Sequence, residues 1–338
     1  MKGVSVIICC YNSALRLPET LKYISRQKVS GLINWEVIIV NNLSTDNTAE
    51  VAAAECTRYK NDNLTFKIAD QPIAGLSFAR EKGVETAAYD YLVFCDDDNW
   101  LDENYIENAF NLMELWPTAG IIGGRGIAKP EVDPPDWFET YSGYYATGAQ
   151  NGSSGIMKGD SPYVYGAGAV IRKSVLKKLD DLGFKPIATD RLNNTLSSGG
   201  DVELSYAVKL IGYDIAYSDE LKFFHFIQKN RLTNRYLIQL AYHFGYCNIL
   251  HRPYFWIFNP QLLRFKKTWV WTLIISLHIY LVSFFNLLKK RNSPDNFIAK
   301  VNVSHAKGRF AAILKSRSEI EKACRSISRK FNTIPRSN

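Results

Sequence analysis

Residues 91–100 read YLVFCDDDNW, an apolar run of five residues that is followed at once by the carboxylates Asp96, Asp97 and Asp98. A short, β-rich apolar run of this kind predicts a buried strand. Adjacent like charges raise one another's pKa unless a cation compensates them. The stretch therefore predicts a strand that ends at a Mg²⁺ or Mn²⁺ site, where two carboxylates share the ion with water and substrate phosphates. The alternative is an acidic turn that caps the next helix through Asp102.

Strand and helix patterns alternate on both sides of this stretch. Further short apolar runs predict strands at 4–10, 36–40, 64–69 and 120–124, and the segments between predict helices at about 14–28, 46–60, 77–88 and 102–115. This alternation predicts an α/β fold with a mixed, mostly parallel sheet flanked by helices. In open sheets of this class, ligands gather at the carboxyl ends of the strands. The run at 4–10 lacks a small-residue cleavage site, so we expect a first strand there and not a signal peptide.

The middle of the chain is less regular. Residues 129–166 are rich in Pro, Gly, Ser and aromatic residues, which predicts a long loop. Its segment 148–155, next to Trp137, Tyr141, Tyr144 and Tyr145, either closes over a bound sugar or is a disordered surface loop. A strand at 168–171, a helix at 173–181, a helix from about Asp201 and a short strand at 214–218 follow.

The C-terminal third has a different composition. We expect a boundary near residue 230, with residues 1–230 forming the α/β domain and 231–338 an aromatic, basic, helical region. Residues 289–338 hold 13 Lys and Arg against three acidic residues, so this tail carries +10 and residues 1–288 carry −2 of the net +8. The six cysteines show no metal-ligand spacing and no disulfide framework, which favours a reducing compartment.

An uncharged stretch precedes this basic tail. Residues 268–288, TWVWTLIISLHIYLVSFFNLL, are long enough to cross a bilayer, and Trp269 and Trp271 stand where an interfacial belt would lie. Basic residues on both sides give no orientation, so an in-plane or re-entrant helix on an anionic membrane surface is an equal alternative. A buried helix of a small helical domain is the third reading.

Several polar turns follow the predicted strands, and each by itself is weak. Six motifs occur in order: VSVIICCYN at 4–12, VNNLSTDNT at 40–48, GLSFAR at 75–80, the Asp triplet at 96–98, GGDVEL at 199–204, and His225. In this order they resemble the family 2 glycosyltransferases over residues 3–230, about two thirds of the chain. The resemblance implies a GT-A fold and an inverting transferase that uses a nucleotide-diphosphate sugar, with a UDP-sugar expected as donor.

The resemblance also implies roles for individual residues. By family pattern, Tyr11 and Asn42 face the nucleobase with Arg80 nearby, and Asp96 and Asp97 approach the ribose. Asp98, with Asp96, holds the metal on the diphosphate, and His225 reaches the metal or diphosphate. Asp201 is the general base that takes the proton of the acceptor hydroxyl.

The chain departs from the family pattern at two positions. Asn41-Asn42 stands where Asp-Asp is usual, which affects which nucleobase the donor is expected to carry. Gly200 replaces an acidic residue before the general base, which affects the contact with the acceptor. The segment 228–232, QKNRL, is faintly similar to the QxxRW motif of processive synthases, but Leu232 replaces the Trp and we expect no polymerase.

These expectations combine into one function. The chain is expected to transfer a sugar to a hydroxyl of a glycan or lipid-linked acceptor, in surface polysaccharide or glycoconjugate synthesis, at the cytoplasmic face of a membrane. The alternative is a membrane-associated scaffold that kept the fold and lost activity. A dinucleotide-dependent oxidoreductase is excluded because its Gly-rich turn is missing after the first strand. A nucleic-acid partner is not expected, because the basic tail lacks aromatic interleaving.

Overall fold

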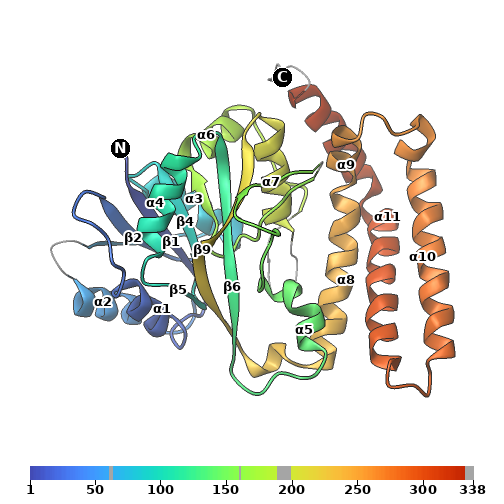
Figure 1. Ribbon diagram of the computed structural model, residues 1–338, viewed down its shortest axis with the longest axis horizontal. Coiled ribbons are helices and arrows are strands. Elements are labelled where there is room, and N and C mark those ends of the chain that lie inside the picture. Colours follow the sequence, from blue (N-terminus) through green and yellow to red (C-terminus); the bar gives the residue numbers. More distant parts are fainter. Residues whose placement is uncertain (61–63, 160, 189–198, 332–338) are drawn as a thin grey trace.

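The chain forms one extended sheet with helices on both faces and a layer of long helices at one end. The structure, a computed structural model, describes residues 1–60, 64–159, 161–188 and 199–331. Figure 1 shows the sheet domain on the left and the helices α8 (Asn234–Leu250), α11 (Asn296–Phe331) and α10 (Trp269–Lys289) side by side on the right. The predicted α/β architecture with a helical C-terminal region is confirmed.

The sheet has the strand order β3-β2-β1-β4-β8-β6-β9-β5, with β7 also paired to β9. Its N-terminal strands, β1 (Val4–Cys10), β2 (Trp35–Asn41), β3 (Thr65–Asp70) and β4 (Tyr91–Asp96), pair in parallel. The strands β5 (Asn99–Leu101), β7 (Gly155–Ile156) and β8 (Val170–Arg172) pair antiparallel, whereas β6 (Ala119–Pro130) and β9 (Asp214–Ile227) pair with each other in parallel.

The central strands are buried on both faces, as the continuous apolar runs predict. Successive residues of β1 alternate between two cores: Val6 and Ile8 belong to one, and Ile7 belongs to the other with Ile38 of β2. The helices that cover the sheet are α1 (Leu17–Ile24), α2 (Thr48–Tyr59), α3 (Leu76–Thr86), α4 (Tyr105–Leu115), α6 (Lys173–Asp181) and α7 (Gly200–Leu210). This arrangement brings the carboxyl ends of β1, β2 and β4 to one edge.

Two sequence-based boundaries were wrong. The strand expected at 214–218 continues to Ile227, because residues 222–227 pair with β6 beyond a bulge and residues 223–225 pair with β5. The segment 129–166 is not one loop, since it contains the end of β6, α5 (Phe138–Tyr141), η1 (Ser142–Tyr145) and β7.

Segment 148–155 is tied to the sheet, which contradicts the disordered alternative. The Gly148 N–H donates to the Gly126 carbonyl, and the Ser154 hydroxyl accepts from the Asp219 N–H. Among the neighbouring aromatic residues, Tyr144 packs against the helix layer: it stacks on Phe244 of α8 with ring centroids 4.3 Å apart. The closure of this segment over a sugar stays a prediction.

Two glycines bring the helices α8 and α11 of this layer into close contact. A Cβ at Gly245 of α8 would lie 1.9 Å from the His305 carbonyl oxygen, and one at Gly308 of α11 would lie 1.9 Å from the Tyr242 carbonyl oxygen. The two helices therefore touch backbone to backbone, and any side chain at either position would separate them. The helix α9 (Arg252–Phe258) and the turn η3 (Arg264–Lys267) connect α8 to α10.

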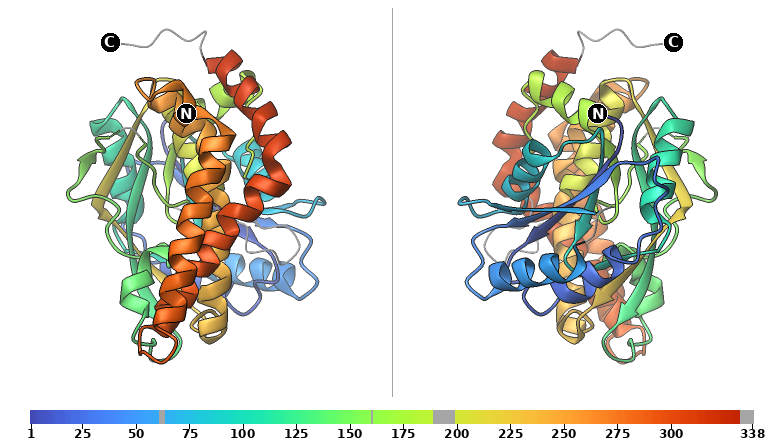
Figure 2. Two further views of the ribbon diagram at one scale, coloured as in Figure 1. Left: turned by 90° about the vertical axis from the view of Figure 1, so that its right-hand side faces the viewer. Right: turned by 90° about the vertical axis from the view of Figure 1, so that its left-hand side faces the viewer.

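The predicted apolar helix is present as α10, with Thr268 as its N-cap accepting from the Trp271 N–H. Within the described ranges it is the one helix long and apolar enough to cross a membrane, and 11% of its most apolar window is buried. Figure 2 shows α10 and α11 forming the outer face of the helix layer.

Candidate active site

Polar residues gather where β1, β2 and β4 end. In the register of the parallel pairs, Cys10 lies opposite Asn41, and Cys9 lies opposite Asp96. The turns that follow these positions therefore meet at one edge of the sheet, as the strand order requires. The Asp triplet, the turn after β1 and the turn after β2 are brought together in this way.

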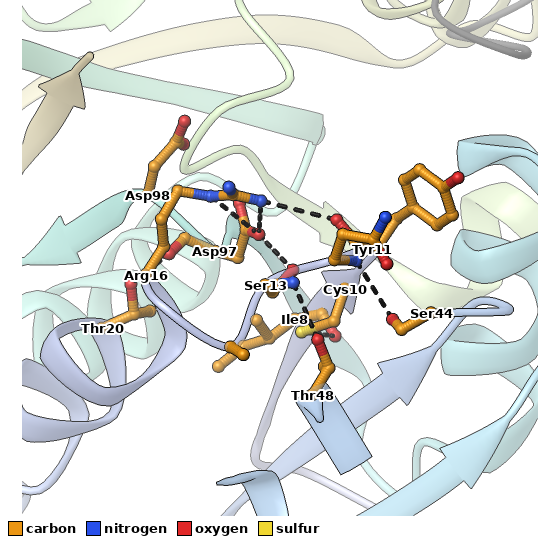
Figure 3. A network of polar contacts seen from close by, with 12 residues as sticks. Ile8, Cys10, Tyr11, Ser13, Arg16, Thr20, Ser44, Thr48, Asp97 and Asp98 are labelled. Carbon is orange, nitrogen blue, oxygen red and sulfur yellow. Dashed lines mark hydrogen bonds and ion pairs between the residues drawn. The ribbon is translucent and has the colours of Figure 1, made fainter. Parts of the chain in front are cut away.

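Asp97 faces into the protein and joins β4 to the turn after β1 (Figure 3). Its carboxylate accepts hydrogen bonds from Arg16 Nη2 at 2.6 Å, from Arg16 Nε at 3.1 Å and from the Ser13 hydroxyl. The Thr20 hydroxyl donates to its carbonyl oxygen at 2.7 Å. Burial and the neighbouring Asp98 raise the pKa of Asp97 to about 6, against the lowering effect of Arg16. The carboxylate thus serves as an internal anchor, and its predicted ribose contact stays a prediction.

Asp98 faces two groups that come from the end of β9 and the turn after it. Its Oδ2 accepts from Arg231 Nη1 at 3.1 Å, and its Oδ1 lies 3.6 Å from His225 Nε2. The Asp98 side chain is 13% exposed, and its carbonyl accepts from the Phe226 N–H. The negative charge of Asp98 raises the pKa of the buried Arg231 guanidinium above its usual value, against the effect of burial.

The tautomer of His225 is fixed by Tyr145. His225 Nδ1 lies 2.6 Å from the Tyr145 carbonyl oxygen, which can only accept, so Nδ1 carries the proton. In the neutral ring this leaves the lone pair on Nε2, on the side of Asp98. The Tyr145 hydroxyl also donates to the Arg231 carbonyl oxygen at 2.9 Å. Tyr145 thus holds both His225, through its carbonyl oxygen, and the backbone of Arg231, through its hydroxyl.

Asp98 and His225 fit a divalent cation. A carboxylate oxygen and an imidazole nitrogen 3.6 Å apart suit two ligands of one Mn²⁺ or Mg²⁺ ion, which would complete its shell with phosphate oxygens and water. In the parts of the chain that the structure describes, no three His, Cys, Asp or Glu side chains form such a group. Asp96, the other predicted ligand, accepts from Asn99 Nδ2 at 3.4 Å, so its place on the metal rests on the resemblance.

Asp201 lies in the first turn of α7, at the end of a glycine turn. Gly199 has φ +116°, a conformation that other residues rarely adopt, and Asp201 follows two positions later. Its Oδ2 accepts from the Gly166 N–H at 3.0 Å, and its Oδ1 accepts from the Val202 N–H at 2.8 Å. Hydrogen bonds from N–H groups and the positive end of the helix favour the ionised carboxylate, the form that a general base needs.

Arg80 lies close to Asp201. A Cβ at Gly166 would be 3.1 Å from Arg80 Nη2 and 3.2 Å from Asp201 Cβ, so Gly166 separates the two side chains. The Arg80 guanidinium lies over the Phe94 ring, 5.4 Å from its centroid. The structure therefore places a positive charge beside the predicted base, where diphosphate or acceptor would also be expected.

The two residues predicted to contact the nucleobase, Tyr11 and Asn42, differ in how accessible their side chains are. The Tyr11 side chain is exposed, and Figure 3 shows its ring directed away from the Asp97 network. Asn42 is buried: its Nδ2 donates to the Gln71 and Ile73 carbonyls, and its Oδ1 accepts from the Gly75 N–H at 2.8 Å. Asn42 thus holds the segment 71–75, and a direct contact with the nucleobase stays a prediction.

The C-terminal helices reach the turn that carries Asp201. His251 Nε2 lies 3.0 Å from the Gly199 carbonyl oxygen, and the Tyr254 hydroxyl donates to Glu203 Oε1 at 2.7 Å. Burial lowers the pKa of His251 to about 4, so the ring is neutral at pH 7. The predicted boundary near 230 therefore separates the turn that carries Asp201 from residues that support it.

Sequence reasoning missed Arg16, Arg231 and His251 as parts of this site. Arg231 lies in the segment 228–232 whose similarity to a synthase motif is faint. The other two carry no signal in the sequence, because each acts on a residue more than 50 positions away.

Comparisons with known proteins identify the family of the chain. Residues 5–180, just over half of the chain, match the family model described as Glycosyl transferase family 2. A poly-beta-1,6-N-acetyl-D-glucosamine synthase of Staphylococcus epidermidis is 24% identical over 218 residues, which cover 64% of this chain and 48% of that protein. The cholesterol galactosyltransferase of Borreliella burgdorferi is 32% identical over 108 residues, 32% of this chain and 28% of that one. The chain thus spans less than half of the length of these two relatives.

A solved structure shares the fold. The crystal structure of TarS 1-349 from S. aureus superposes with a TM-score of 0.50 at 14% identity, covering 94% of this chain and 92% of that chain. At this identity the likeness concerns the fold alone, and it extends over the helix layer as well as the sheet domain.

Proposed function

The chain belongs to glycosyl transferase family 2, and on this premise we propose that it transfers a sugar from a nucleotide-diphosphate donor to an acceptor hydroxyl with inversion. One observation carries the proposal. Asp98 and His225, with the tautomer of His225 fixed by Tyr145, face each other near the carboxyl end of β4. The inactive scaffold is the weaker alternative, because a scaffold has no need for an imidazole whose orientation is fixed beside a carboxylate.

We infer that the donor is a UDP-sugar and that the metal is Mg²⁺ or Mn²⁺. When bound by Asp98 and His225, the metal would neutralise charge on the diphosphate leaving group. Arg231 adds a second, permanent positive charge on Asp98. Tyr11, Asn42, Arg80, Asp96 and Asp97 keep their proposed roles as donor contacts, with the exposed Tyr11 ring the most accessible to a base.

Asp201 is proposed as the general base. The acceptor hydroxyl oxygen attacks the anomeric carbon from the face opposite the diphosphate, the bond to the diphosphate oxygen breaks, and the hydroxyl proton passes to the Asp201 carboxylate. The N–H groups of Gly166 and Val202 hold that carboxylate in place. Direct displacement of this kind inverts the anomeric centre.

The acceptor is proposed to be a glycan or a lipid-linked hydroxyl at the cytoplasmic face of a membrane, in surface polysaccharide or glycoconjugate synthesis. The names of the relatives support this class: one acts in synthesis of a poly-N-acetylglucosamine, and one on cholesterol. The exposed apolar helix α10 supports the membrane location.

Calorimetry with UDP in the presence and absence of Mn²⁺ tests the proposal. UDP should bind at least about tenfold more tightly with Mn²⁺, and Asp98→Ala should remove that difference. Glu85→Ala, which changes an exposed carboxylate of α3, is the control and should bind as the wild type does. Equal UDP affinity with Mn²⁺ and with chelator would refute the metal site. If the protein releases UDP from none of a panel of UDP-sugars with any acceptor extract, the inactive scaffold would be favoured.

A further inference from the structure

The helix α10 presents a broad apolar side to solvent, while its most deeply buried residues are polar. Its two fully buried residues are Thr272 and Ser276, and the buried Ser276 hydroxyl has no hydrogen-bond partner. Eight of its apolar side chains are each 38–65% exposed: Val270, Ile274, Leu277, Leu281, Val282, Phe284, Phe285 and Leu288. A helix that is held by a soluble core shows the reverse arrangement, because the hydrophobic effect buries its apolar face.

The contact between α10 and α11 is apolar near the start of α10, where Trp269 and Leu273 pack against a buried cluster that includes Ile313 and Ile320, and it is loosely filled toward the other end. A cavity of about 210 Å³ lies between the two helices, lined in part by Ser283, Asn286, Asn302 and His305. Apolar packing against the protein therefore does not explain the eight exposed apolar side chains of α10. The contiguous apolar face on the outside needs a partner of its own.

Charge decides between the candidate partners. Residues 260–318 contain 11 Lys and Arg but a single acidic residue, Asp295. Basic groups lie at both ends of α10, at Arg264, Lys266 and Lys267 before it and at Lys289, Lys290 and Arg291 after it. A second copy of this chain would place basic ends against basic ends in either the parallel or the antiparallel arrangement. An anionic surface complements both ends at once.

We propose that α10 lies flat in the headgroup region of an anionic phospholipid bilayer, with its outer face among the acyl chains and the basic residues at its two ends against lipid phosphates. A helix of 21 residues is about 31 Å long and could also cross the hydrocarbon core by length alone. The fold excludes crossing as long as the helix layer stays together. α11 runs beside α10 (Figure 2) and would carry Lys300, Lys307 and Lys315 into the hydrocarbon.

The glycine contacts make this constraint strong. α11 touches α8 backbone to backbone at Gly245 and Gly308. His251, between α8 and α9, contacts Gly199, and Tyr254 of α9 contacts Glu203. A crossing α10 would have to separate from α11 or draw the catalytic domain into the membrane. In the flat orientation the sheet domain stays in water while its helix layer rests on the membrane.

This inference refines the membrane location in the proposed function and does not depend on its chemistry. Flotation of the full-length chain with phosphatidylcholine vesicles and with vesicles that also contain phosphatidylglycerol tests it. The chain should float with the anionic vesicles and much less with the neutral ones. Leu277→Glu with Leu281→Glu should lower binding about tenfold or more, because two charges would enter the apolar face. Lys266→Gln with Lys267→Gln should lower it about fivefold for each charge.

Leu32→Glu is the matched control, since Leu32 is 93% exposed on a distant loop and should leave flotation unchanged. Far-UV circular dichroism and thermal melting should be unaltered in every variant, because all the changed side chains are at the surface. UDP affinity measured on the same variants separates the two proposals: UDP binding without flotation would overturn only the membrane inference. A dimer in solution that the Leu277→Glu, Leu281→Glu variant splits, with no flotation, would assign the face to a second copy.

The orientation is tested with an epitope tag added at the C-terminus, in sealed membrane vesicles from cells that make the full-length chain. In the flat orientation the tag and the sheet domain are cut by protease from the same side. A tag that is protected while the sheet domain is digested would show that α10 crosses the bilayer and would overturn the inference.

Discussion

Glu203 is the buried carboxylate that supports the turn carrying Asp201, and its removal should destabilise the protein strongly. Its side chain is fully buried. It accepts from the Ile187 N–H at 2.8 Å, from the Ala188 N–H at 2.7 Å and from the Tyr254 hydroxyl at 2.7 Å. The carboxylate thereby joins α7, the segment before it and α9 at one point.

The expected losses follow from the donors that each variant leaves without an acceptor. Glu203→Ala leaves two backbone N–H groups and one hydroxyl without an acceptor, and at about 1–3 kcal/mol for each of the three groups the free energy of unfolding should fall by about 3–9 kcal/mol. Glu203→Gln keeps the shape and one acceptor oxygen for the two N–H groups, while its NH2 group donates to the Tyr254 hydroxyl oxygen in place of accepting from it, so the loss is mainly the charge assistance, about 1–2 kcal/mol. Tyr254→Phe removes one bond and should cost about 1–2 kcal/mol.

Urea denaturation followed by circular dichroism at pH 7 measures this series, with Glu85→Ala on the surface as a control that should change stability by less than about 0.5 kcal/mol. Because Asp201 is two residues from Glu203, sugar transfer should also fall in the folded Glu203→Ala protein, more than UDP affinity does. A Glu203→Ala protein within about 1 kcal/mol of wild type would refute the reasoning, as would a Gln variant as unstable as the Ala variant.

Three further predictions concern the charged residues of the site. Asp201→Asn keeps the size of the side chain but cannot take a proton, so turnover should fall by roughly 10²-fold or more with UDP affinity unchanged; near-normal turnover would make Asp201 a helix cap only. Arg231→Gln removes the guanidinium from Asp98, so Mn²⁺ should raise the melting temperature more in this variant than in wild type, and an equal rise would show that the two cations do not compete. Burial raises the pKa of Asp97 in the folded state to about 6, above that in the unfolded chain, so the wild type should be most stable relative to Asp97→Asn below about pH 4. That advantage should decline by up to about 3 kcal/mol as pH rises through 6, and a pH-independent difference in urea denaturation would contradict it.

The sequence by itself determined the sheet and the places where polar side chains leave it. The apolar runs that became β1, β2 and β4 need no tertiary information, because a strand buried on both faces is apolar along its whole length. The positions of the Asp triplet and of Asp201 follow from the same pattern, since a strand end and a glycine-preceded helix start are local features. The end of β9 was not predictable, because its second half is fixed by pairing with β5 and β6.

Only the tertiary structure decided how each carboxylate is used. Nothing in DDD distinguishes Asp97 from Asp98, yet one is bound by Arg16 from α1's N-terminal turn and the other faces Arg231 and His225 from beyond β9. The exposed side of α10 is equally invisible in a run of 21 uncharged residues, because only the folded chain shows that Thr272 and Ser276 are buried while apolar residues of the same helix are exposed. Partners that lie 80 to 133 positions apart are brought together by chain topology, whereas local sequence sets only the element that presents each side chain.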